Sequence, residues 1–230
     1  MSTTLDQSLS HLARHIPGAT RIFLEYGLDF CCGGGRSLRE AALARGLETQ
    51  EIASRLEALE RQRILRAPDW QYRSPAELIP HILDRFHKHH REQLPELIRL
   101  ARRVEQVHGE HPQWPRGLAN QLGTLQEELE SHMQKEEQIL FPLLARGLRA
   151  FVQMPIQVMR EEHDQHGQAL ERLAQCTRDF TPPPEACSTW QALYLGLKTL
   201  RADLMEHVHL ENNILFETAA STHRMETSHG

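Results

Sequence analysis

The chain has 230 residues, of which 40% are hydrophobic and 25% charged, and its formal net charge is −5. This composition is typical of a globular protein with one large domain or two modest ones, and the acidic balance argues against nucleic acid as a partner. Residues 1–10 lack a secretory pattern and no apolar run could span a bilayer. We therefore expect no membrane partner and a cytoplasmic location.

Helical periodicity recurs along the chain, whereas strand patterns are nearly absent, so we predict an all-α fold. Residues 1–66 predict a small domain of short helices, with a glycine-rich turn at Cys31–Gly35. Ser37 and Glu40 form a capping box at the start of its third helix. Residues 67–74, which contain Pro68 and are followed by Pro75, are the expected linker.

The second half predicts four long helices joined by short loops, followed by a polar tail over residues 221–230. Short loops favour antiparallel neighbours, so residues 75–220 are expected to form an up-down-up-down four-helix bundle. The expected helices cover about 74–108, 116–146, 154–178 and 188–219.

An internal repeat lies within this bundle. The pattern H-x-x-x-E-x-x-I-L-F occurs at residues 132–141 and again at 207–216, and the pattern H-x-x-H lies one helix hairpin before each copy, at 87–90 and 163–166. Residues four apart share one helix face, and the apolar triplet after each pair is expected to turn that face toward the core. The repeat predicts one metal pocket with six ligands: His87, His132, Glu136, His163, His207 and Glu211.

A single H-x-x-x-E pair on a helix is usually a solvated face, but two copies with matching apolar tails are hard to assign to a surface. Four imidazoles and two carboxylates, without a thiolate, favour iron or manganese over structural zinc. Glu136 and Glu211 could bridge two cations. Six residues cannot saturate two six-coordinate ions, so open positions remain for oxo or hydroxo groups, O₂ or NO.

Other candidate residues allow two interpretations each. His108 either approaches the site or caps its helix, and we favour capping. Cys31 and Cys32 either transfer iron or an NO-modified species as a thiol pair, or are small buried side chains beside a turn. We expect Cys176 and Cys187 to be structural. The acidic run 160–164 around His163 offers carboxylates that could orient a ligand imidazole. Five further histidines are expected either behind the ligands or exposed: His81, His89, His90, His166 and His209.

Four longer runs are more specific than the repeat: Asp29 to Gly34, His87 to Leu97, Lys135 to Pro142, and Thr181 to Cys187. Through them nearly the whole chain resembles the repair-of-iron-centres proteins, which carry a short N-terminal domain before a haemerythrin-like bundle. By position, the resemblance implies two iron ions per chain, the same six ligands, and Glu136 and Glu211 as bridges.

The resemblance also implies a cytoplasmic stress-response role, namely the repair of iron–sulfur clusters damaged by NO or peroxide, with iron as the donated species. The clients would be iron–sulfur proteins or a cluster scaffold, and NO or O₂ the small ligands. The alternatives are an enzyme that reduces NO to nitrous oxide and a sensor of NO or O₂. The sequence leaves open whether the protein is a monomer or a dimer.

Overall fold

The computed structural model describes residues 4–16, 18–62 and 73–221. Within these ranges the named elements are all helices, and the only extended pairing is an isolated bridge between Ser8 and Ser37. The predicted all-α fold is confirmed. Contacts divide the chain into two units, residues 1–78 with 205–230 and residues 79–204. Helix α10 (Ser188–Leu210) runs unbroken through this boundary.

The N-terminal residues form short helices with distinct start signals. The predicted capping box is present, because Ser37 accepts a hydrogen bond from Glu40 N–H while the Glu40 side chain accepts one from Ser37 N–H. Ser8 caps the first helix through His11 N–H. Buried apolar side chains such as Phe23 hold the helices together. The elements are η1 (Thr4–Asp6), α1 (Leu9–His15), α2 (Ala19–Glu25), α3 (Leu38–Leu43) and α4 (Thr49–Gln62).

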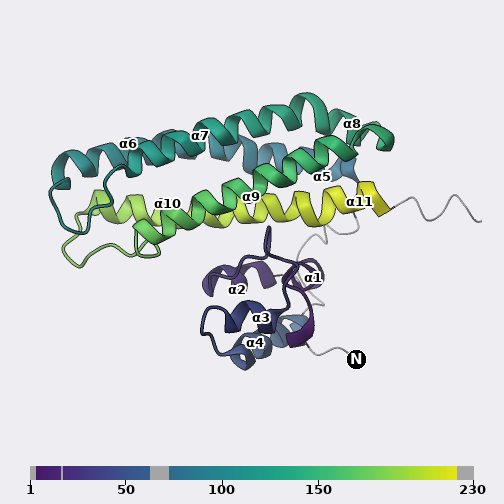
Figure 1. The fold of residues 1–230 in the computed structure, drawn as a ribbon, viewed down its shortest axis with the longest axis horizontal. Helices are drawn as coiled ribbons and strands as arrows, with labels where there is room; N and C mark the ends of the chain where they lie inside the picture. The colour runs from purple at the N-terminus through teal and green to yellow at the C-terminus, as the bar shows by residue number, and fades with distance from the viewer. Residues whose placement is uncertain (1–3, 17, 63–72, 222–230) are drawn as a thin grey trace, which may run out of the picture. The chain divides into compact units, whose positions relative to one another are not determined.

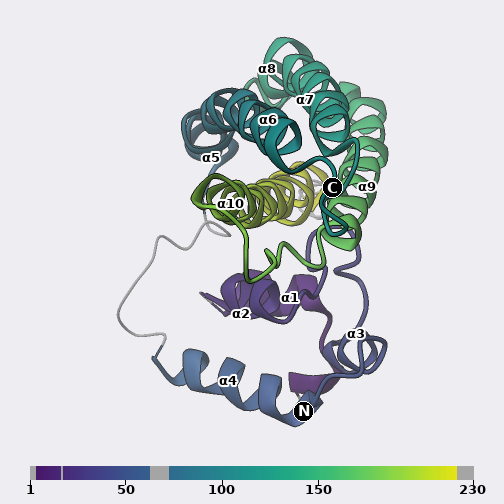
Figure 2. The same ribbon diagram turned by 90° about the vertical axis from the view of Figure 1, so that its left-hand side faces the viewer.

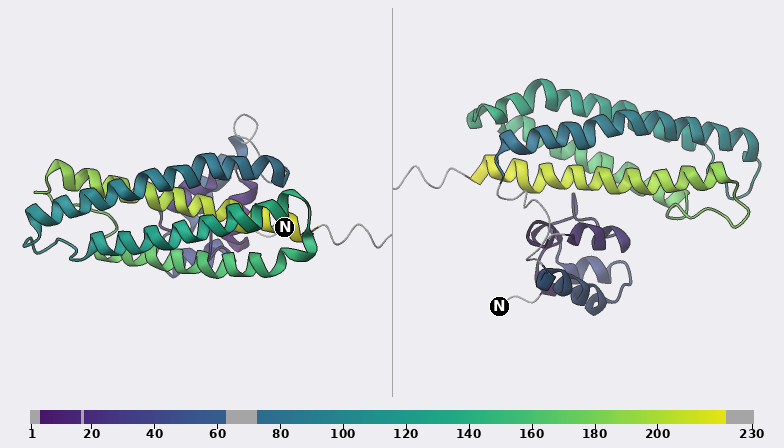
Figure 3. Two further views of the ribbon diagram at one scale, coloured as in Figure 1. Left: turned by 90° about the horizontal axis from the view of Figure 1, so that it is seen from above. Right: turned by 180° about the vertical axis from the view of Figure 1, so that it is seen from behind.

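Four helical rods follow, and α6, α7, α9 and α10 run beside one another in the ribbon views (Figures 1, 2 and 3). Helix α6 packs along α7, and α7 along α9. Gln93 of α6 donates a hydrogen bond to the Gly196 carbonyl of α10. The rods are α5 (Pro75–Ile82), η3 (Leu83–His87) and α6 (Lys88–His108); α7 (Leu118–Lys135), η4 (Glu136–Leu140) and α8 (Phe141–Ala145); α9 (Gln153–Cys176) after η5 (Arg149–Phe151); and α10, η6 (Glu211–Leu215) and α11 (Phe216–Ser221).

Three of the rods contain a five-residue π-helical turn, which the sequence analysis did not foresee. Each turn closes with a bond from an N–H to the carbonyl five residues earlier, for example Phe141 N–H to Glu136. Element η3 ends at His87, η4 begins at Glu136 and η6 begins at Glu211. Single π turns inside α-helices occur frequently at functional sites, and here each one borders a predicted ligand.

The apolar triplets after the two H-x-x-x-E pairs differ from expectation at one position. Leu140 and Phe141 are buried, as are all three members of the second triplet, residues 214–216. Ile139, however, is 54% exposed, so its predicted place in the core is wrong. Ile214 has the same place in the second π turn and is only 6% exposed, so the π turn by itself does not explain why Ile139 faces outward.

Most of the predicted linker (67–72) and tail (222–230) lies outside the described residues. In the described part of the chain, no helix is both long enough and apolar enough to cross a membrane.

Candidate metal centre

The six predicted ligands all lie in the interior. Their exposed fractions are 0% or 1%, although every one of them is polar or charged. They come from four rods: His87 from η3, His132 and Glu136 from the junction of α7 and η4, His163 from α9, and His207 and Glu211 from the junction of α10 and η6. Burial of so many polar groups is costly unless they share partners.

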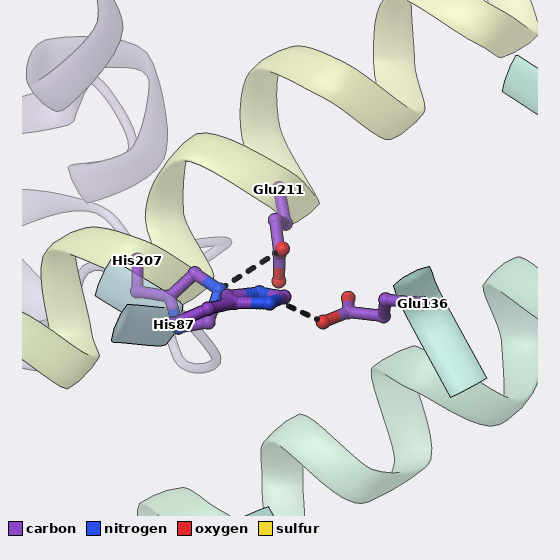
Figure 4. Close-up of side chains that lie close together, drawn as sticks. All are labelled: His87, Glu136, His207 and Glu211. Atoms are coloured by element: carbon purple, nitrogen blue, oxygen red, sulfur yellow. Dashed lines mark hydrogen bonds and ion pairs between the residues drawn. The ribbon is translucent and has the colours of Figure 1, made fainter. Parts of the chain in front are cut away.

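The ligand atoms gather into two groups that share both carboxylates. One group contains His87 and His207 with Glu136 and Glu211, and within it the ligand atoms lie within 4.8 Å of one another (Figure 4). The other contains His132 and His163 with the same two glutamates. Two neighbouring cation positions, each with two imidazoles and two shared carboxylates, follow from this arrangement.

The imidazoles face the carboxylates through Nε2. The Nε2 atoms of His87 and His132 each lie 3.4 Å from Oε2 of Glu136. Nε2 of His207 lies 3.0 Å from Oε1 of Glu211, and Nε2 of His163 lies 3.0 Å from Nε2 of His132. The donor set is therefore concentrated in one small volume.

An outer carboxylate fixes the His87 ring. Nδ1 of His87 lies 2.8 Å from Oε1 of Glu137. A carboxylate only accepts hydrogen bonds, so Nδ1 carries the proton and Nε2 keeps its lone pair for a metal. Arg91 donates to Glu137 at 2.9 Å and to both oxygens of Glu130. Partial burial opposes ionisation of Glu137, but the hydrogen bonds from Arg91 and His87 outweigh it and lower its pKa.

A second outer carboxylate does the same for His132. Nδ1 of His132 lies 2.9 Å from Oε2 of Glu162, whose other oxygen accepts a short hydrogen bond from Lys135. The hydrogen bond from His132, followed by that from Lys135, lowers the pKa of Glu162 to about 2. Each metal position thus has one histidine held by a glutamate that is itself paired with a cation.

Only one of these two carboxylates was among the residues expected from the sequence. Glu162 belongs to the acidic run 160–164 proposed to orient an imidazole, although it orients His132 and not its neighbour His163. Glu137 was missed. The available signal was its position directly after the predicted ligand Glu136, and the contact with His87 comes from the neighbouring rod.

The remaining histidines lie outside both groups of the described structure. His108 ends α6, about 30 Å along the rod from His87 at ~1.5 Å per residue, and its ring packs 5.6 Å from that of Trp190. His90 and His166 are buried, and the His166 ring contacts that of His132 edge-on at 5.0 Å. Burial, with a smaller contribution from Arg14, lowers the pKa of the buried His209 to about 4.

His81 and His89 lie nearer the surface. His81 is only partly buried, and burial together with the Arg85 charge lowers its pKa. The side chain of His89 is 41% exposed and lies 3.4 Å from the buried carboxylate of Asp203.

The pocket fits a pair of divalent or trivalent iron ions. Borderline imidazoles and hard carboxylates suit iron or manganese, and the four protein atoms at each position leave coordination sites open. Glu136 and Glu211, which belong to both groups, would neutralise part of the charge of bound cations in a site shielded from water. Bound iron would supply redox chemistry and Lewis acidity, while the protein holds the geometry and the proton positions of the imidazoles.

Two family models match the chain. The haemerythrin HHE cation-binding domain matches residues 78–219 and so contains all six residues of the two groups. The ScdA N-terminal domain, described as a domain of unknown function, matches residues 5–60.

Curated relatives match along nearly the full length. The iron-sulfur cluster repair protein YtfE of Yersinia pseudotuberculosis is 50% identical over 214 residues, covering 93% of this chain and 96% of that protein. The protein of the same name from Escherichia coli O17:K52:H18 is 49% identical with the same coverage. A probable iron-sulfur cluster repair protein of Haemophilus influenzae is 51% identical over 91% of this chain and 95% of its own length. The chain therefore belongs to the haemerythrin HHE cation-binding family and, within it, to the group of iron-sulfur cluster repair proteins represented by YtfE.

Proposed function

We propose that the protein restores damaged iron–sulfur clusters by donating iron, and that two iron ions with an oxo or hydroxo bridge occupy the two groups that share Glu136 and Glu211. The observation that carries this proposal is the open, doubly shared site, in which four imidazoles and two carboxylates serve two neighbouring cations. An ion held by few protein ligands can leave more easily than one whose coordination positions are all filled by protein ligands. The names of the relatives point to the same activity.

The direct test uses a dehydratase whose cluster has been damaged by NO or peroxide. Iron-loaded protein should restore its activity, and it should transfer iron to an apo-cluster scaffold. The Glu136→Gln variant should do neither, because it removes one charge from both metal positions at once. Equal repair by wild type and variant, or no repair and no iron transfer by either, contradicts the proposal.

A second candidate is the reduction of NO to nitrous oxide, favoured by the adjacency of the two metal positions. Two NO molecules would take up two electrons from the ferrous pair and two protons, giving nitrous oxide and water. Gas analysis of the anaerobic diferrous protein with an electron donor tests it. Multiple turnovers favour the enzyme, whereas at most one equivalent per chain argues against it.

The partners follow from the same proposal. The clients are iron–sulfur proteins or their assembly scaffold, NO and O₂ are ligands of the open positions, and the setting is the reducing cytoplasm. A reducing setting agrees with the thiol state of all four cysteines, which lie in the described part of the chain.

A further inference from the structure

The loop that carries the adjacent cysteines is built around one carboxylate. Asp29 follows α2, and its Oδ1 accepts hydrogen bonds from Cys31 N–H at 3.1 Å and Cys32 N–H at 3.0 Å. Its Oδ2 accepts one from Gly33 N–H at 2.9 Å. Three consecutive backbone donors thus converge on a single side chain, and both cysteines are wrapped around it.

The same loop is fastened from its other side. The Gly34 carbonyl accepts a hydrogen bond from Ser10 N–H at 2.8 Å, at the start of α1. A Cβ atom at Gly34 would lie 2.4 Å from the Phe30 carbonyl oxygen, so only glycine lets the chain pass there. Gly35 has open space around it instead. The loop conformation is therefore fixed by its own hydrogen bonds and by the tight passage at Gly34, without a bound ligand.

This conformation brings the sulfurs to the separation that a tetrahedral cation requires. Sγ of Cys31 lies 3.8 Å from Sγ of Cys32 and 3.2 Å from Oδ1 of Asp29. With a metal–sulfur distance of about 2.3 Å, a 3.8 Å separation corresponds to an S–metal–S angle of about 111°, close to tetrahedral. The three ligand atoms lie within 4.8 Å of one another.

A disulfide is the competing use of two neighbouring thiols, and the geometry disfavours it. Adjacent Cα atoms are about 3.8 Å apart across a trans peptide, which is shorter than the roughly 4.4 Å minimum usual for disulfides. Cys31 and Cys32 are accordingly present as thiols. A disulfide would also require the two sulfurs to approach from 3.8 Å to about 2.05 Å, whereas a metal ion bound between them leaves the 3.8 Å separation unchanged.

Metal binding at this loop must release a proton from Cys31. The hydrogen bond with Cys32, burial, and the nearby Asp29 charge raise the pKa of Cys31 well above its usual range, so a bound cation has to displace that proton. Asp29 is exposed and Cys32 is half-buried, which leaves an approach from solvent.

We propose that Asp29, Cys31 and Cys32 form a separate, mononuclear site for one Fe²⁺ ion in transit, with the fourth position open to water or to a ligand of the client. Two S–H bonds are replaced by two Fe–S bonds, both protons pass to solvent, and iron remains ferrous. No oxidant or reductant is needed. The identity of the cation as iron rests on the proposed repair function, whereas the site itself rests on the loop geometry.

The test uses full-length protein whose His/Glu centre has first been filled with iron under anaerobic conditions. Co²⁺ is then titrated in. We expect one further equivalent per chain, with thiolate-to-cobalt charge-transfer absorption and the intense ligand-field bands of tetrahedral Co²⁺, while elemental analysis shows the original iron retained. Isotopically labelled Fe²⁺ should give a Mössbauer signal of thiolate-bound ferrous iron in the same protein.

Matched variants make the result decisive. Cys31→Ser and Cys32→Ser should each abolish the charge-transfer signal, whereas Cys176→Ser should keep it. Gly34→Ala should lose the signal and Gly35→Ala should retain it, with unchanged iron in the His/Glu centre reporting intact folding in each. An absent extra equivalent, or a signal that survives both cysteine substitutions, overturns the inference. Binding of Co²⁺ by a protein that fails to repair clusters contradicts the proposed function alone.

Discussion

Replacing each outer glutamate by glutamine should loosen one iron ion and spare the other. Glu162 holds His132, which belongs to one metal group, and Glu137 holds His87, which belongs to the other. In Glu162→Gln the amide can still approach Nδ1 of His132, but it loses the charge that strengthens the imidazole as a ligand. The pKa of about 2 at Glu162 reflects how strongly that charge is held by His132 and Lys135.

Loss of such an orienting partner typically weakens metal affinity about 10- to 100-fold, which corresponds to about 1.4–2.7 kcal/mol. Because His163, Glu136 and Glu211 are unchanged, the affected iron should be weakened and not excluded. The unaffected iron keeps both of its histidines and the glutamate that orients one of them. We therefore expect iron release in two separated phases for each variant.

The assay is anaerobic competition against a chelator, with iron per chain measured at each chelator concentration. Wild type and Glu161→Gln, which alters an exposed neighbour bonded only to Gln157 among the described contacts, should release iron together at high chelator concentration. Iron release from Glu162→Gln and from Glu137→Gln should each reach a plateau at half of the wild-type iron content before the second ion leaves. Release of both ions in one step by either variant, or wild-type behaviour in both, would refute the assignment of one glutamate to each position.

Further predictions concern stability. Gly196→Ala should destabilise the protein by about 1–3 kcal/mol, because the added Cβ would lie 2.6 Å from Cδ2 of the buried Leu97. Gly123→Ala, in open space on α7, should instead stabilise the protein by up to ~1 kcal/mol. Chemical denaturation of both variants measures the two changes. Removal of both iron ions should lower the melting temperature by roughly 10–20 °C when each site had been held at a free iron concentration near 100 times its dissociation constant. Calorimetry before and after chelation measures this shift. Burial raises the pKa of Tyr194, so the unfolded state releases this proton first and stability falls as pH rises above about 10; Tyr194→Phe should lessen that fall in denaturation curves.

The repeat made the ligands predictable because its signal is local. A histidine and a glutamate four residues apart share a helix face wherever the helix packs. Two matching hairpins place two such faces, and two faces with a single histidine each, at one level. The helix ends were equally accessible, since Ser37 with Glu40 and the proline-rich loop after Thr181 act on neighbouring backbone. The six predicted side chains gather into two groups in the structure, and their role as metal ligands stays a prediction.

The features that escaped prediction depend on contacts distant in sequence. Nothing in the local pattern distinguishes a π turn from an α turn. The outward position of Ile139 and the contact between Glu137 and His87 depend on how the neighbouring helices pack, which the local pattern does not contain. The anchoring role of Asp29 arises in the same way, because a carboxylate that collects three backbone N–H groups is defined by the turn it creates.

The measurement that bears most directly on the metal centre is the iron content of anaerobically reconstituted protein, compared with that of Glu136→Gln and Glu211→Gln. Two groups sharing both carboxylates predict about two tightly held iron ions per chain in the unaltered protein. They also predict weakened binding at both positions in each variant. A protein that holds no iron, or variants that lose only one ion, would contradict a centre bridged by these two glutamates.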